Sequence, residues 1–307
     1  MNESKSLGDK VFNITNVLIM LILMFLTLYP FWFSIVNSLN DGTDLIRGYC
    51  FFWPRQFTLA SWRTVLADPS IMNAAWITAS RTLIVTVVSI FNTAMFSYAF
   101  SRPYLKHKKF YSVLGFVSMY FSGGLIPVFM LFKWLGLYDN YLVYIIPSLF
   151  AGFFNVIIFN ANFKAIPDSL FESAKTDGAN EFTIFFRIVL PLSKPVLAAL
   201  SVFVAVGIWN DYGTTLFFTQ SNFLDTLQYF TLKLVLSSQA ADHLKNVALQ
   251  TSPELASLLS KSAGSGPVTS RTIELASMVL ASLPMIIIYP FAQKFFVKGV
   301  MIGSIKG

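Results

Sequence analysis

The residue types best suited to binding chemistry lie together in one apolar stretch, as the run Trp209-Asn210-Asp211-Tyr212. An aromatic face beside polar groups suits a pyranose ring, which is apolar on its faces and hydroxylated at its edge. Asp211 is the single charge in the apolar run 196–218, and a carboxylate in such a run is by default a functional group, for example for an ion or a proton. These residues therefore indicate binding of a sugar or transfer of an ion.

Further candidates for the lining of a solute path are Met119 and Asn155. An asparagine inside an apolar segment needs a hydrogen-bond partner, so Asn155 faces a neighbouring helix or a cavity. Interhelical hydrogen bonding explains such an amide as well as solute contact does. A methionine or aromatic residue at helical spacing more often serves plain packing.

Motifs for covalent or nucleotide chemistry are absent from the sequence. No G-x-x-x-x-G-K-[ST] phosphate loop occurs, since GSGPVTS lacks both the lysine and the spacing. There is no H-E-x-x-H motif or nucleophile motif, and the single cysteine, Cys50, excludes a cysteine metal cluster. The two histidines, His107 and His243, fall on opposite faces in the topology derived below. We expect no catalytic residue, no metal site and no ATP hydrolysis by this chain alone.

The composition is that of a membrane protein. Hydrophobic residues make up 55% of the chain and charged residues only 12%, with a mean hydropathy of +0.63. About 20 residues span the hydrocarbon layer, where a charge is costly. Five uncharged windows of 19 to 30 residues, and the run interrupted by Asp211, predict an all-α membrane protein with six transmembrane helices. The expected spans are about 14–36, 74–100, 111–132, 141–163, 196–218 and 275–293.

The distribution of lysine and arginine predicts the orientation. With the N-terminal segment 1–13 inside, the inner segments carry 13 basic residues and the outer loops 8, and the whole net charge of +7 falls on the inner side. Both termini are then cytoplasmic, and residues 14–307 form a single transmembrane domain. The outer loops are 37–73, long enough for a small folded cap or an interfacial helix, and 220–271. This asymmetry explains the basic composition without nucleic acid, and the long first apolar stretch argues against a signal peptide.

Two charges lie inside the predicted spans. Arg81 and Asp211 each lie about eight residues from the outer ends of their helices, roughly 12 Å deep at 1.5 Å per residue. Opposite charges buried at equal depth tend to pair or to share a wet cavity. We therefore predict a buried ion pair between Arg81 and Asp211, direct or bridged by water.

A polar island, residues 165–195, separates two of the apolar segments. It reads as two short helices joined by a glycine. Ser169 and Glu172 have the spacing of a capping box at the start of the first helix, and Asp177-Gly178 is the expected stop. The second helix is expected from about 181 to 189 and to end before Pro191. On this reading Glu172 has at least a capping role.

The island resembles the EAA loop of bacterial ABC importer permeases. Glu172, Ala174, Asp177, Gly178, Ala179, Ile188, Leu190, Pro191 and Pro195 follow in the expected order, with Ser173 where the motif usually has alanine. In that family the loop, here 164–195, is cytoplasmic and docks on an ATP-hydrolysing subunit. The residues that the resemblance assigns to ATPase coupling are Glu172, Ser173, Ala174, Asp177, Gly178, Ala179, Phe182 and Arg187.

Other stretches extend the resemblance over nearly the whole chain. Three further stretches are similar to carbohydrate-uptake permeases of the type I importer fold. They are the segment FSGGLIPVFMLFKWLGLYDN, the tail KFFVKGVMIGSIKG and the Trp-Asn-acid run. Within that class the chain looks most like permeases for oligosaccharides and polygalacturonan. The resemblance implies a homologous second permease subunit, two ATPase subunits that hold ATP and magnesium, and an extracytoplasmic solute-binding protein, all at the bacterial cell membrane. This chain itself would bind no cofactor.

Other functions remain open on the sequence. A secondary transporter or channel could use Asp211 as its ion or proton group, although the polar island would then have no role. An ABC importer permease for a solute other than sugar, or a membrane scaffold or receptor subunit, is also compatible with the pattern. The break expected at Ser122-Gly123-Gly124 and Pro127 in the third span fits any of these, because interrupted helices are tolerated where protein or water covers the backbone.

Overall fold

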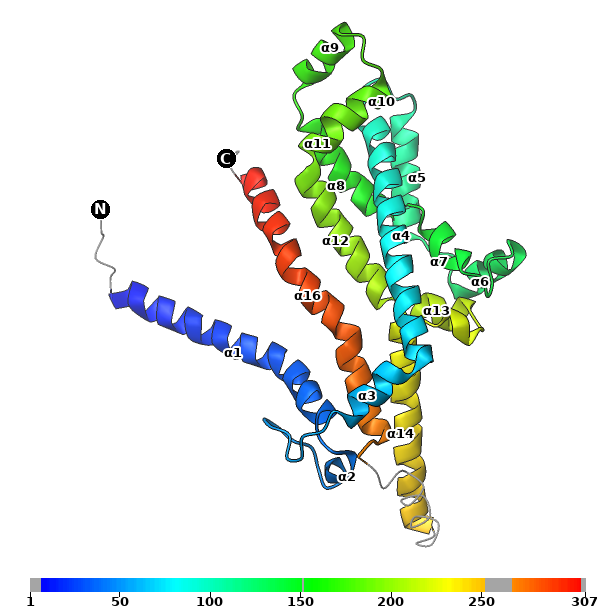
Figure 1. Cartoon of the computed structure of the whole chain (residues 1–307). Helices are drawn as coiled ribbons and strands as arrows, with labels where there is room; N and C mark the ends of the chain where they lie inside the picture. The colour runs from blue at the N-terminus through cyan, green and yellow to red at the C-terminus, as the bar shows by residue number, and fades with distance from the viewer. Residues whose placement is uncertain (1–6, 151, 252–266, 305–307) are drawn as a thin grey trace. The chain divides into compact units, whose positions relative to one another are not determined.

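The computed structural model describes residues 7–150, 152–251 and 267–304, and over these residues the chain is helical, with one isolated bridge between Asn40 and Phe57 and no strand. It divides into two compact units. Unit 1 comprises residues 1–69 and 231–282, and unit 2 comprises 70–230 and 283–307. Figure 1 gives the helices their labels.

Unit 1 contains a folded cap after its first helix. Its elements are α1 (Leu7–Ser38), α2 (Gly42–Leu45), α3 (Ala60–Ala67), most of α14 (Leu227–Thr251) and the first part of α16 (Ser270–Ser304). The buried Asn37 side chain donates to the Cys50 carbonyl and accepts from the Cys50 amide, both at 2.8 Å. The Trp62 indole donates to the Ser38 hydroxyl at 3.1 Å. Residues 37–73 therefore include a small folded cap, whereas residues 252–266 of the later outer loop lie outside the described residues.

Unit 2 holds the polar island and most of the apolar helices. Its elements are α4 (Pro69–Ser101), α5 (Lys108–Tyr120), α6 (Leu125–Trp134), α7 (Leu142–Ile145), η1 (Ile146–Ser148), α8 (Gly152–Lys164), α9 (Asp168–Thr176), α10 (Glu181–Ile184), the π-helix η2 (Phe185–Val189), α11 (Leu190–Leu192), α12 (Lys194–Asn210), α13 (Gly213–Phe218) and η3 (Asn222–Leu224). Helix α8 packs against both α5 and α12 (Figure 1).

Three helical stretches are long and apolar enough to cross a membrane, Gly8–Ser38, Pro69–Ser101 and Ser270–Pro290. Three bent pairs also pass by length and composition, so up to six crossings are available among the described residues. The pairs are α5 with α6, α7–η1 with α8, and the helical run Glu181–Leu192 with α12, with bends of 110°, 47° and 80°. In the last pair only α12 lies in the span expected at 196–218.

The break expected in the third apolar segment is present. Helix α5 ends at Tyr120 and α6 begins at Leu125, and Gly124 between them has φ +82°. A second break divides the run 196–218 into two helices, because Asp211 has an extended backbone after the last residue of α12. A helix that ends inside an apolar segment needs donors for its last carbonyl groups, because the helix itself supplies none.

Arg81 of α4 satisfies the carbonyls at the second break. Its guanidinium donates to the Ile208 carbonyl at 2.7 Å and to the Asp211 carbonyl. It also lies 3.3 Å from the Asp211 carboxylate and 4.9 Å from the centre of the Tyr144 ring. The contact expected between Arg81 and Asp211 is therefore present, but the arginine is in addition the C-terminal cap of α12. A cation at that position is also favoured by the helix dipole.

The two members of this pair differ in burial. The Arg81 side chain is 1% exposed and the Asp211 side chain 30% exposed. Asp211 is further engaged through its other oxygen, which accepts from the Thr214 amide at the start of α13 at 3.1 Å. The pair thus joins α4, α12 and α13 at one point.

We expect Arg81→Ala to destabilise the chain by about 3 kcal/mol, because two carbonyls and a carboxylate lose their donor in an apolar region. Asp211→Asn should cost about 1 kcal/mol, since the carboxylate is partly exposed, its contact with the guanidinium is long at 3.3 Å, and both carbonyls keep their donor. The measurement is the thermal unfolding midpoint of the detergent-purified protein. Arg63→Ala, which removes an exposed arginine of α3, is the control. Equal losses from Arg81→Ala and Asp211→Asn would show that the ion pair, not the helix cap, provides the stabilisation.

Candidate functional site

The first helix of the polar island begins two residues earlier than a capping box at Ser169 and Glu172 requires. The N-cap of α9 is Pro167, and no side chain caps its free amides. Ser169 and Glu172 therefore lie inside the helix, and the expected capping box is wrong. In the part of the chain that the structure describes, the Glu172 carboxylate is exposed and has no hydrogen-bond or ion-pair partner. A capping role consequently does not explain this residue.

The end of α9 is the expected one. The Gly178 amide donates to the Lys175 carbonyl at 3.0 Å, and the Ala179 amide donates to the Ala174 carbonyl at 2.9 Å. These two bonds make a Schellman motif, in which the residue after the C-cap takes a left-handed conformation. Gly178 has φ +78°, which other residues adopt at a cost, while no atom lies within 4 Å of the position a Cβ would take. The requirement for glycine here is a backbone requirement.

The second helical run continues further than expected. After α10, residues Phe185–Val189 form a π-helix, and α11 then includes Pro191. The expectation that this run ends before Pro191 is therefore wrong. Proline lacks an amide hydrogen and its ring clashes with the carbonyl four residues back in an α-helix. The wider π register, with bonds to the fifth residue back, accommodates both effects.

Helix α9 has a buried side and an exposed side. Phe171 is 5% exposed, and Ala174 and the following Ala179 are half-buried against the same apolar cluster. The other residues assigned to coupling are all exposed: Glu172, Ser173, Asp177, Gly178, Phe182 and Arg187. The helix is thus attached by one face, and its charged and polar face is open in this chain.

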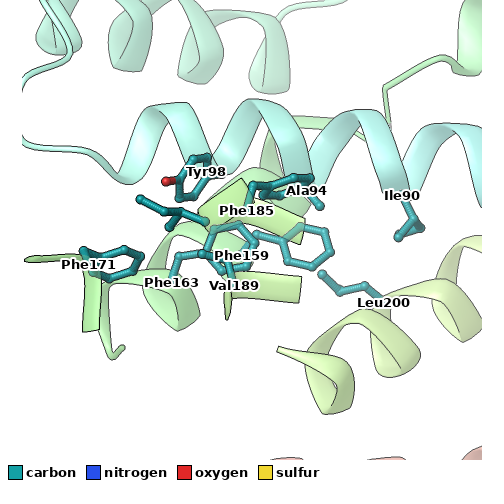
Figure 2. Close-up of a cluster of buried hydrophobic side chains, with 10 residues drawn as sticks. Ile90, Ala94, Tyr98, Phe159, Phe163, Phe171, Phe185, Val189 and Leu200 are labelled. Carbon is teal, nitrogen blue, oxygen red and sulfur yellow. The ribbon is translucent and has the colours of Figure 1, made fainter. Parts of the chain in front are cut away.

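Phe171 was missed by the sequence reasoning, although its spacing of three from Ala174 marks an apolar helix face. It belongs to a core cluster that Figure 2 shows between α4, α8, α10–η2 and α12. The other members are Ile90, Ala94, Tyr98, Phe159, Phe163, Ile184, Phe185, Val189 and Leu200. The Phe159 and Phe163 rings of α8 stack with centres 5.5 Å apart. Through Phe171, α9 is packed directly on the apolar helices.

The residues proposed for a solute path do not share one face. Trp209 is 7% exposed, whereas Asn210 and Tyr212 are exposed, and the Asn210 amide donates back to the Val206 carbonyl at 3.0 Å. Asp211 is held by Arg81. Met119 is exposed and Asn155 half-buried. Of the run 209–212, the two side chains open for contact with another molecule are therefore Asn210 and Tyr212.

Comparison with known proteins agrees with this architecture. Residues 7–302 match the model of the family described as binding-protein-dependent transport system inner membrane component. The protein LplC of Bacillus subtilis (strain 168) is 34% identical over 308 residues, which cover 100% of this chain and 98% of that protein. The polygalacturonan/rhamnogalacturonan transport system permease protein YtcP of the same organism is 34% identical, covering 91% of this chain and 92% of that protein.

A solved structure gives the same result at the level of the fold. A chain in the crystal structure of a bacterial ABC transporter involved in the import of the acidic polysaccharide alginate has a TM-score of 0.82 and 27% identity. The match covers 96% of this chain and 100% of that chain. From the matched family model and these relatives, the chain belongs to the family of binding-protein-dependent transport system inner membrane components.

Proposed function

We propose that this chain is a membrane-spanning permease subunit of an ATP-driven bacterial importer for an oligosaccharide. The observation that carries the proposal is the two-sided helix α9, which is anchored through Phe171 and leaves Glu172 and its neighbours uncovered. A polar helix face without an intramolecular role, fixed on apolar helices, fits the docking element of an ATPase subunit. The assignment of the chain to its family supports the same reading.

The proposal includes the membrane topology and the partners. Six crossings place both termini and residues 164–195 in the cytoplasm, consistent with three apolar helices and three bent pairs. A homologous second permease and two ATPase subunits complete the core, and a solute-binding protein delivers the sugar from outside. ATP and magnesium bind to the ATPase subunits, so that this chain needs no cofactor of its own.

In the proposed cycle, α9 is the point at which nucleotide binding acts on the permease. Closure of the ATPase dimer on ATP moves α9, and the helices attached to it change from an inward-facing to an outward-facing arrangement. Hydrolysis then returns them. A ligand shifts such an equilibrium only by its differential affinity for the two states, so the ATPase must contact α9 differently in each.

The proposed substrate is an oligosaccharide, because the relatives are named for polygalacturonan and rhamnogalacturonan transport and for alginate import. Asn210 and Tyr212 are the proposed sugar contacts in this chain, beside the buried Trp209. The pairing of Asp211 with Arg81 disfavours the alternative of ion-coupled transport, since the carboxylate is already occupied by a guanidinium.

We expect Glu172→Ala to abolish uptake without unfolding the chain, because the Glu172 carboxylate has no partner in the described residues. Gly178→Pro should abolish uptake through the backbone, since proline cannot adopt φ +78° and cannot donate to the Lys175 carbonyl. The measurement is uptake of galacturonate oligosaccharides by cells that express each variant, with membrane levels determined by immunoblot.

Lys109→Ala is the control for Glu172→Ala, because it removes an exposed charge of α5 from the same predicted face of the membrane. It should transport like the unaltered protein. Normal transport by Glu172→Ala at normal membrane levels would contradict the docking role.

Purification of the tagged full-length chain in mild detergent should recover an ATPase and a second, similar membrane protein. Glu172→Ala and Gly178→Pro should recover less ATPase but as much second permease, since the permease contact does not require α9. The protein composition of the complexes is measured by mass spectrometry. Recovery of the chain alone, from cells that transport the sugar, would contradict the proposed assembly.

A further inference from the structure

One carboxylate beside α9 collects hydrogen-bond donors from three parts of unit 2. Glu181, the first residue of α10, accepts from the Tyr98 hydroxyl of α4 at 2.5 Å and pairs with the Lys175 ammonium of α9 at 3.0 Å. The Tyr104 hydroxyl, from the segment between α4 and α5, is a third donor. These four residues are called the Glu181 cluster below. None of its members belongs to the residues that the motif assigned to coupling.

The donors keep Glu181 charged. Partial burial raises the pKa of Glu181, but hydrogen bonds from Tyr98, Tyr104 and Lys175 outweigh it and lower this pKa from 4.5 to about 2. A group with a lowered pKa contributes fully to stability above its ordinary value, and here the contribution is lost only as the pH falls towards 2. Burial, together with Glu181, raises the pKa of Tyr104 to about 12, so this hydroxyl stays protonated. The Glu181 cluster is therefore intact at cellular pH.

Tyr98 also takes part in the other attachment of α9. The Arg102 guanidinium lies 4.8 Å from the centre of the Tyr98 ring and 3.9 Å from the centre of the Phe171 ring. Arg102, Tyr98 and Phe171 are all buried. Arg102 thus lies between the face of the Tyr98 ring and Phe171 of α9. The Tyr98 hydroxyl is linked to the same helix through Glu181 and Lys175.

Apolar packing between α4 and α10 is incomplete beside the cluster. A pocket of about 340 Å³ lies there, and its lining includes Met95, Ala99 and Phe182 together with Tyr98 and Glu181. Beside this space the hydrogen bond between Glu181 and Tyr98 links α10 to α4, in addition to the apolar contacts of Ile184 and Phe185. A hydrogen bond to a charged group is strongly dependent on distance and direction, so it resists sliding better than apolar contacts do.

We propose that the Glu181 cluster is a positioning device that makes α4 move together with α9 when an ATPase subunit acts on α9. This inference rests on the proposed function. Phe171 and Ala174 attach one face of α9 to the apolar cluster, through contacts that have no strong directional preference. The Glu181 cluster adds a directional polar contact at Lys175, next to the Schellman turn, and so restricts sliding and rotation of α9 against α4.

The test uses the complete importer in lipid vesicles and does not require the natural sugar. Cys50→Ser removes the single native cysteine, and Thr86→Cys introduces a labelling site in α4. The labelling rate with a membrane-impermeant maleimide is measured with and without ATP, alongside ATP hydrolysis. We expect ATP to change this rate, and Tyr98→Phe and Glu181→Ala to reduce the change about tenfold, as for the loss of a hydrogen bond to a charged group. ATP hydrolysis should persist.

Tyr98→Phe is the sharper variant, because it removes one oxygen and keeps the ring that packs on Arg102. Its matched control is Tyr111→Phe, which removes a hydroxyl from a tyrosine of α5 that is 41% exposed. Glu181→Gln should have an intermediate effect, since its amide oxygen still accepts from Tyr98 but no longer attracts Lys175. This gradation is not expected of a site that only supports folding.

The outcomes separate this proposal from the function on which it rests. An unaltered ATP-dependent change of labelling in both variants would overturn it. The proposal would also be overturned if Tyr98→Phe lost ATP hydrolysis together with the ATP-dependent change of labelling, or if it failed to assemble. Either result would assign the cluster a purely structural role. Absence of an ATPase from the unaltered complex would instead contradict the proposed function itself.

Discussion

Backbone carbonyls at helix ends must find donors where water is scarce, and this constraint shapes unit 2. Helix α12 stops inside an apolar run, so its last carbonyls would be orphaned without Arg81. Arg81 is therefore buried because it completes the backbone hydrogen bonding of α12, and its ion pair with Asp211 is a second interaction. Because Arg81 is the thirteenth residue of α4, the end of α12 is fixed against the first half of α4. The register of these helices follows from that contact.

Helix α9 of the polar island lies outside the apolar core but depends on that core for its stability. Its nine residues are too few for a stable isolated helix in water. The missing stability of α9 comes from three further features. These are the Schellman turn, the packing of Phe171 in the apolar cluster, and the pairing of Lys175 with Glu181. The open face is consequently held rigidly enough to receive a partner. Rigid presentation of a charged face reduces the ordering cost of binding.

The sequence predicted the features that depend on composition and local chemistry. The breaks at Gly124 and after Gly178 followed from the conformational freedom of glycine, and the proximity of Arg81 and Asp211 followed from equal depth alone. The capping box was wrong because Ser169 can be the first or the third residue of a helix start, and Pro167 decided between the two. The π-helix before Pro191 and the carbonyl partners of Arg81 depend on packing between distant segments. The Glu181 cluster could not be predicted either, since Tyr98 and Glu181 are 83 residues apart.

The π-helix at Phe185–Val189 has a geometric consequence for the helix that follows it. It accommodates one residue more than the same turn of α-helix would, and each residue of an α-helix advances the direction of the side chains by about 100°. The wide turn therefore shifts the side-chain directions of α11 relative to those of α10. After α11 the chain leaves the helical conformation at Ser193 and bends by 80° into α12. The polar island and α12 are thus joined through a wide turn and a bend, and not through one continuous α-helix.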